Sequence, residues 1–120
     1  MTMDLNDEKP EEYKQGFAMF CGQKFIVSPD VLIPRIETEE IIDISLKQLA
    51  GRGQQTVNII DVGTGSGCIG ITLFLELQKR EINSQIILSD ISKEALAVTA
   101  TNVRRFRIPD ENVRVIRSDL

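Results

Sequence analysis

Three alternating glycines follow an apolar run in the middle of the chain, in the segment D-V-G-T-G-S-G at residues 61–67. Glycine lets a backbone turn sharply and lets a ligand approach the main chain closely. A helix that begins directly after such a turn adds free N–H groups and a partial positive charge. We therefore interpret this segment as a ligand-binding loop. The alternative is a tight turn between a strand and a helix that binds nothing.

The glycines can be assigned to two motifs that favour different ligands. Gly63, Gly65 and Gly67 are spaced as G-x-G-x-G, whereas Gly65, Gly67 and Gly70 have the G-x-G-x-x-G spacing of dinucleotide-binding proteins. Asp61 favours the first reading, because a carboxylate just before the glycines repels a pyrophosphate and suits a cationic or amino-bearing ligand. S-adenosylmethionine carries a sulfonium and an α-amino group and no phosphate.

Two more carboxylates follow later apolar runs. Asp90 comes at the end of L-S-D-I (residues 88–91), where a nucleotide-type cofactor would present its ribose hydroxyls and Ile91 would lie against the adenine. Asp119 follows a third apolar run and can accept a hydrogen bond from the adenine amino group. The alternatives are a turn residue before the Ser92 helix cap for Asp90, and an exposed loop residue for Asp119.

Alternating strands and helices are predicted to position these residues. We expect strands at 57–62, 86–89 and 113–116, with helices at 68–79 and 93–105 between them. The run at 57–62 is nearly all apolar, which is typical of a strand buried on both faces of a parallel sheet. The inner face of the helix at 93–105 is predicted to carry Leu96, Ala100 and Val103. This order is one half of a doubly wound α/β sheet.

The residues before the sheet are predicted to form three segments. We expect a flexible acidic tail at 1–15, then a β-hairpin and extended connector at 16–36, with strands at 17–20 and 24–27. A helix over 38–49 opens the partial Rossmann-like cofactor-binding domain, which spans 37–120.

Composition and net charge exclude several classes of function. The 120 residues are 42% hydrophobic and 27% charged, which fits one soluble domain. The net charge of −4 gives no reason to expect nucleic-acid binding.

The absence of histidine rules out Ser-His or Cys-His catalysis and His-based zinc sites within this chain. Cys21 and Cys68 form no metal motif, so we expect reduced thiols, no metal and a cytoplasmic protein. No stretch is long and apolar enough to predict a membrane span.

Three segments carry a resemblance to a known family: F-C-G-Q-K-F at 20–25, V-L-I-P-R-I-E-T-E at 31–39 and the glycine loop at 61–67. Together they resemble the release-factor glutamine N5-methyltransferases, over about residues 16–120. The glycine loop is shared by most methyltransferases of this fold, whereas the stretch from Pro34 to Glu39 is specific to the family. The resemblance implies a Rossmann-like class I methyltransferase fold. It also implies methyl transfer from S-adenosylmethionine to the glutamine of the Gly-Gly-Gln motif in peptide chain release factors.

The resemblance implies roles for particular residues. The methionine part of the cofactor would be held by Asp61, Gly63, Thr64, Gly65 and Gly67. The ribose and adenine would be held by Asp90, Ile91, Asp119 and Leu120. The cofactor and substrate side of the pocket would be lined by Pro34, Arg35, Glu37 and Thr38.

The sequence also departs from the family pattern. Ile36 replaces a usual proline, the N-terminal helical substrate-recognition domain is missing, and so is the Asn-Pro-Pro-Tyr motif that grips the target amide. We therefore expect the cofactor-binding front half of the enzyme, truncated after the third parallel strand, with no catalytic residue of its own and no activity alone. The alternatives are a non-catalytic cofactor-binding or interaction module, and a fragment of a nicotinamide-dependent oxidoreductase. We expect the strand at 57–62 to be a sheet edge that self-associates or pairs with a missing C-terminal segment.

Overall fold

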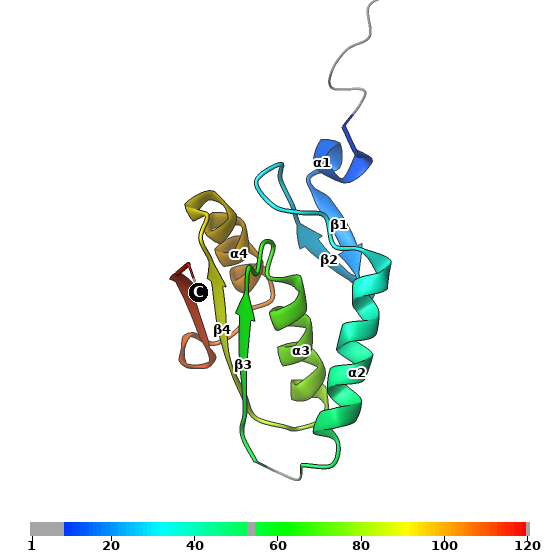
Figure 1. The fold of residues 1–120 in the computed structure, drawn as a ribbon, viewed down its shortest axis with the longest axis vertical. Helices are drawn as coiled ribbons and strands as arrows, with labels where there is room; N and C mark the ends of the chain where they lie inside the picture. The colour runs from blue at the N-terminus through cyan, green and yellow to red at the C-terminus, as the bar shows by residue number, and fades with distance from the viewer. Residues whose placement is uncertain (1–8, 53–54, 120) are drawn as a thin grey trace, which may run out of the picture.

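A three-stranded parallel sheet and a two-stranded hairpin make up the β structure of the described residues (Figure 1). The computed structural model describes residues 9–52 and 55–119. In chain order, the elements are α1 (Glu11–Gln15), β1 (Phe17–Phe20), β2 (Gln23–Ile26), the 3-10 turn η2 (Ile36–Thr38), α2 (Glu39–Leu49), β3 (Val57–Val62), α3 (Cys68–Lys79), β4 (Ser84–Asp90), α4 (Lys93–Arg105), the 3-10 turn η3 (Asp110–Asn112) and β5 (Val113–Arg117).

The parallel sheet confirms the predicted alternation of strands and helices. Its order is β3-β4-β5, and Asp61 of β3 lies opposite Leu88 of β4. Strand β3 and helices α3 and α4 have the predicted bounds, while β4 extends to 84–90 and β5 to 113–117. All three strands run in the same direction, so their carboxyl ends gather at one edge of the sheet, as an α/β ligand site requires.

Burial alternates along β3, which corrects one prediction. Val57 is buried and Ile59 half-buried, whereas the side chains of Ile60 and Val62 are 63% and 53% exposed. The expectation that residues 57–62 are buried on both faces is therefore wrong for the described part of the chain. The reason is that α3 and α4 both pack on the face that carries the buried residues Ile86 and Leu88 of β4.

The hairpin is anchored in the main hydrophobic core. Phe20 and Phe25 are buried there, and the Phe25 ring lies 4.9 Å from the ring of Phe106, just after α4. Gly22 has the positive φ of 75° that the predicted turn requires. In Figure 1 the hairpin lies above α3, and the hydrogen bonds between Asn102 and Ile26 join it to α4.

The N-terminal segment is more ordered than the sequence indicates. Residues 11–15, which we assigned to a flexible tail, form the short helix α1. The Tyr13 hydroxyl donates a hydrogen bond of 2.7 Å to the Val31 carbonyl, and this contact ties α1 to the connector after the hairpin. Residues 1–8 of the predicted tail lie outside the described residues. Within the described ranges, no helix has the length and apolar character needed to cross a bilayer.

Candidate functional site

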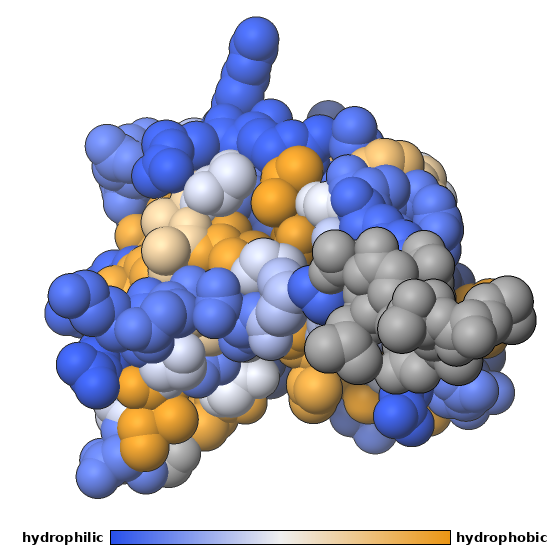
Figure 2. Space-filling view, turned by 90° about the horizontal axis from the view of Figure 1, so that it is seen from above, coloured by the Kyte–Doolittle hydropathy of each residue, from blue (hydrophilic) through white to orange (hydrophobic). Residues whose placement is uncertain are grey.

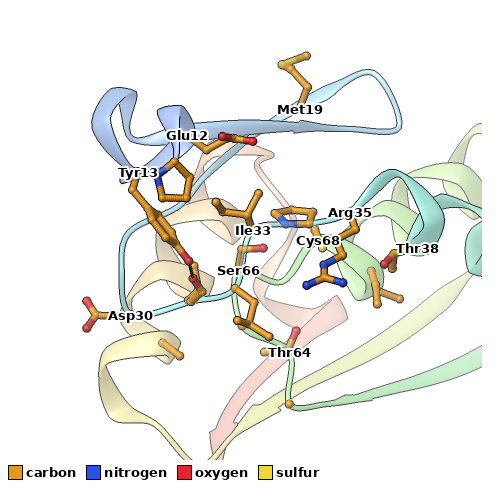
Figure 3. Close-up of a pocket in the computed structure, with 18 of the residues that line it drawn as sticks. Glu12, Tyr13, Met19, Asp30, Ile33, Arg35, Thr38, Thr64, Ser66 and Cys68 are labelled. Atoms are coloured by element: carbon orange, nitrogen blue, oxygen red, sulfur yellow. Dashed lines mark hydrogen bonds between the residues drawn. The ribbon is translucent and has the colours of Figure 1, made fainter. Parts of the chain in front are cut away.

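A cavity of about 1390 Å³ lies where the glycine loop meets the connector between the hairpin and α2 (Figure 3). Eight predicted site residues line it: Gly63, Thr64, Gly65 and Asp90 from the sheet edge, and Pro34, Arg35, Glu37 and Thr38 from the connector. Seen from above, this end of the molecule shows apolar patches between hydrophilic ridges (Figure 2). The structure therefore brings the connector, the glycine loop and the end of β4, which are separate in the sequence, into one site.

The glycine loop needs its glycines for backbone conformation. Gly63, Gly65 and Gly67 have φ values of +69°, +58° and +87°, which favour glycine over any residue with a side chain. A Cβ on Gly63 would meet no atom within 4 Å, so its φ and not lack of space selects glycine there. A Cβ on Gly67 would also lie 2.9 Å from the Ile71 Cδ1 atom. The loop thus makes a sharp turn into α3, and its three glycines contribute only main-chain atoms to it.

Asp90, at the end of β4, lines the cavity and contacts the glycine loop. Its Oδ2 atom accepts a hydrogen bond of 3.0 Å from the Gly65 N–H, and its Oδ1 atom accepts one of 3.0 Å from the Ser92 N–H. Each carboxylate oxygen has two acceptor positions, so both can still accept a hydroxyl from a ligand in the cavity. Asp90 can therefore fix the loop and hold a ribose at the same time.

Asp61 supports the glycine loop, and its contact with the methionine part of the cofactor stays a prediction. It is not among the residues that line the cavity. Its Oδ2 atom accepts hydrogen bonds from the Thr64 hydroxyl at 2.8 Å and from the Gly70 N–H at 3.1 Å. Burial raises the pKa of the Asp61 carboxyl, and the hydrogen bonds from Thr64 and Gly70 partly oppose that rise. Asp61 therefore braces the loop from behind.

The remaining predicted contacts lie outside the cavity lining. Gly67 is buried in the loop, while Ile91 and Asp119 are exposed. The Ser118 N–H donates to the Asp90 carbonyl at 3.0 Å, so the chain before Asp119 runs beside the end of β4. Leu120 lies outside the described residues. The adenine contacts of Ile91, Asp119 and Leu120 stay predictions.

The charges around the cavity are mostly negative. Five carboxylates line it, from Glu11, Glu12, Asp30, Glu37 and Asp90, and Arg35 is the one basic residue among the described lining residues. A pyrophosphate would meet this excess of negative charge, whereas a sulfonium or an amino group would be attracted. The negative charge around the cavity therefore suits S-adenosylmethionine better than a dinucleotide.

Several lining residues were missed in the sequence. Tyr13 belongs to the segment assigned to the tail, and Cys68 was expected only to be a reduced thiol outside any metal motif. Burial raises the pKa of the Cys68 thiol to about 11, so the thiol stays protonated near neutral pH and acts as a packing residue. Across the described chain, no group of three or more Cys, Asp or Glu side chains is placed to hold a metal ion.

Helix α4 holds the loop through side chains that hydrophobic periodicity does not reveal. Its buried positions are Ala95, Thr99, Asn102 and Val103. Of the predicted inner face, Val103 is buried, whereas Leu96 and Ala100 are half-buried. The Thr99 hydroxyl donates to the Gly65 carbonyl at 2.6 Å, and the Asn102 amide donates to the Ser66 carbonyl at 2.8 Å. Polar residues face inward here because the loop offers carbonyls that need donors.

Comparisons with known proteins agree with this geometry. The model of the family described as "Methyltransferase small domain" matches residues 18–120. The release factor glutamine methyltransferase of Bacteroides thetaiotaomicron is 41% identical over 98 residues, which are 82% of this chain and 32% of that protein. The enzyme of the same name from Leptospira interrogans is 40% identical over 119 residues, which are 98% of this chain and 40% of that protein. The chain thus spans a third to two-fifths of these relatives.

Solved structures support the fold. The human methyltransferase 10 domain containing protein has a TM-score of 0.64 at 19% identity, and the match covers 97% of this chain and 53% of that one. The precorrin 8W decarboxylase of Methanobacterium thermoautotrophicum has a TM-score of 0.56 at 24% identity, with 79% and 45% covered. These similarities confirm the predicted α/β architecture.

Proposed function

The chain belongs to the methyltransferase small domain family, and from that premise we propose that it binds S-adenosylmethionine for methylation of the glutamine in the Gly-Gly-Gln motif of release factors. The family match agrees with the resemblance seen in the sequence. The 40–41% identity to proteins named release factor glutamine methyltransferase supports a release-factor glutamine as the target of methylation.

The observation that carries this proposal is the position of Asp90. Its carboxylate lines the cavity and also binds the Gly65 N–H of the glycine loop. A cofactor with ribose hydroxyls and a cationic end would find acceptors at Asp90 and a close-approach backbone at Gly63 and Gly65. Arg35, Glu37 and Thr38 on the opposite wall would face the cofactor and the substrate.

When bound, S-adenosylmethionine supplies a methyl group on a positively charged sulfur. The protein's contribution is to bind and orient that group. The carboxylates around the cavity favour the positive charge, and the loop, braced by Asp61 from behind, fixes where the methionine part lies. We propose that these 120 residues supply cofactor binding and do not complete the transfer alone, since the sequence has no Asn-Pro-Pro-Tyr motif to position the target amide.

A comparison of two ligands tests the proposal. We expect calorimetric titration of the chain with S-adenosylhomocysteine to show saturable binding, and titration with NADH to show none, because the acidic cavity opposes a pyrophosphate. Binding of NADH in place of S-adenosylhomocysteine would favour the nicotinamide reading. Binding of neither would favour an interaction module without a cofactor.

The outer side of β3, which is the free edge of the described sheet, is expected to associate with another strand. Strand β3 has a sheet neighbour on one side only among the described residues, and the exposed side chains of Ile60 and Val62 lie along it. We propose that this edge pairs with another strand, from a second copy or from a complementary segment. Light scattering of the chain at tens of micromolar should detect species larger than the monomer.

Matched variants make this result specific to the edge. The double variant Ile60→Lys, Val62→Lys should reduce the association, because charge on an edge opposes strand pairing. Ile44→Lys changes a comparably exposed isoleucine on α2 and should leave association unchanged. A folded monomer at the same concentration in the unaltered chain would overturn the proposal.

A further inference from the structure

The side chain of Asn102 on α4 connects the two walls of the cavity without lining it. Asn102 is fully buried, and its amide makes three hydrogen bonds. Its Oδ1 atom accepts from the Ile26 N–H at 2.8 Å, and its Nδ2 atom donates to the Ile26 carbonyl at 3.0 Å and to the Ser66 carbonyl at 2.8 Å. One side chain therefore bonds the hairpin and the glycine loop together.

The contact with Ile26 fixes the start of the connector. Ile26 is the last residue of β2 and pairs with Phe17 of β1. Asn102 bonds both its N–H and its carbonyl, as a residue of a third strand would. The chain continues directly from this point into the segment that lines the cavity, through Val31 to Thr38. The position of that wall thus depends on where Asn102 holds Ile26.

The contact with Ser66 fixes the opposite wall together with Thr99. Thr99 bonds the Gly65 carbonyl and Asn102 bonds the Ser66 carbonyl, so two consecutive peptide groups of the loop are held from α4. Asp90 holds the Gly65 N–H from the other side. These three bonds determine the orientation of the loop segment that lines the cavity.

We propose that Asn102 is a positioning residue for cofactor binding, which holds the glycine loop and the connector at a fixed separation. Thr99, also on α4, assists it as a second donor to the loop. The amide spans the hairpin and the loop, and the cavity lies between the segments that it anchors. A buried carbonyl that loses its donor must find another, so loss of the amide should displace both walls. The proposal rests on the proposed function, because it concerns the same cofactor.

Four variants separate positioning from simple packing. Asn102→Ala removes all three bonds. Thr99→Val removes the hydroxyl, with its bond to the Gly65 carbonyl and its 3.2 Å bond to the Ala95 carbonyl within α4, and Thr99→Ser keeps that hydroxyl. Arg105→Ala is the matched control, because Arg105 also ties α4 to the hairpin, through a 2.8 Å bond to the Lys24 carbonyl, and does not touch the loop. Circular dichroism establishes that each variant is folded.

Affinity for S-adenosylhomocysteine is the first readout. Its Kd should rise about tenfold or more in Asn102→Ala and about threefold to tenfold in Thr99→Val. It should stay within about twofold in Thr99→Ser and Arg105→Ala. Folded Asn102→Ala and Thr99→Val proteins that bind as the parent does would overturn the proposal and leave the proposed function intact. If Asn102→Ala does not fold, the difference in Kd between Thr99→Val and Thr99→Ser tests the proposal.

Amide hydrogen exchange of the ligand-free chain is the second readout, and it is independent of the proposed function. The Gly65 and Gly67 amides should exchange faster in Asn102→Ala and Thr99→Val and at the parent rate in Arg105→Ala. Unchanged exchange in the first two would overturn the positioning role. If the parent chain binds no S-adenosylhomocysteine, the proposed function fails, and exchange alone decides whether Asn102 and Thr99 position the loop.

Discussion

Replacing Asp90 with alanine should lower the affinity of the chain for S-adenosylhomocysteine at least about a hundredfold, which corresponds to about 2.8 kcal/mol. Two losses add in this variant. The ribose loses a charged acceptor, where each hydrogen bond contributes roughly 1.5–3 kcal/mol. The Gly65 N–H also loses its partner at 3.0 Å, so the loop that forms one wall of the cavity is no longer held from the β4 side.

Isothermal titration calorimetry measures this effect, with Asp110→Ala as the matched control. Asp110 is an exposed carboxylate in η3, which precedes β5 and lies outside the cavity lining, so its removal changes the net charge equally. We expect the control to bind within about twofold of the parent. Equal titration curves for Asp90→Ala and the parent would remove Asp90 from the site and, with it, the main support for the ribose assignment.

Replacing Gly70 with valine should destabilise the fold by about 3 kcal/mol, the upper range for overpacking a core. A Cβ on Gly70 would clash with the Leu88 Cδ2 atom and lie 3.3 Å from the Asp61 Cβ and Oδ2 atoms. Leu88 is fully buried, so its side chain cannot move aside freely. Gly70→Ala should also destabilise, by a smaller amount, although alanine in a helix normally stabilises by up to about 1 kcal/mol relative to glycine.

Thermal unfolding followed by circular dichroism tests this result. Gly70→Val should lower the Tm by roughly 10 °C. Gly51→Val provides the control, because a Cβ on Gly51 meets nothing within 4 Å and its φ is not in the left-handed region. A Gly70→Val protein as stable as the parent would show that α3 and β4 are less closely packed than the structure indicates.

The elements that sequence predicts well here are those with strong local signals. The bounds of β3 and α3 follow from an apolar run, a glycine turn and a helical apolar pattern. For α4, the Ser92 hydroxyl accepts from the Ala95 N–H at 3.1 Å, which is the helix cap that the sequence indicates. These signals lie within a few residues of each other, so they need no knowledge of the packed fold.

What sequence could not predict depends on contacts between distant segments. Thr99 and Asn102 look like surface residues in a helical pattern, and only the packed loop reveals them as buried donors. The position of Asp61 along the strand does not show that its Oδ2 atom accepts hydrogen bonds from Thr64 and Gly70. The place of Tyr13 beside the cavity likewise depends on its bond to Val31, 18 residues away.

Amide chemical shifts recorded during titration with S-adenosylhomocysteine test the central claim most directly. In ¹H–¹⁵N spectra of the labelled chain, we expect saturable changes at Gly63, Thr64, Gly65 and Asp90, and at Arg35 and Thr38 on the opposite wall. The exposed end of α3, around Lys79, should be unaffected. Absence of any change, or changes confined to residues away from the cavity, would contradict the assignment of this site to S-adenosylmethionine.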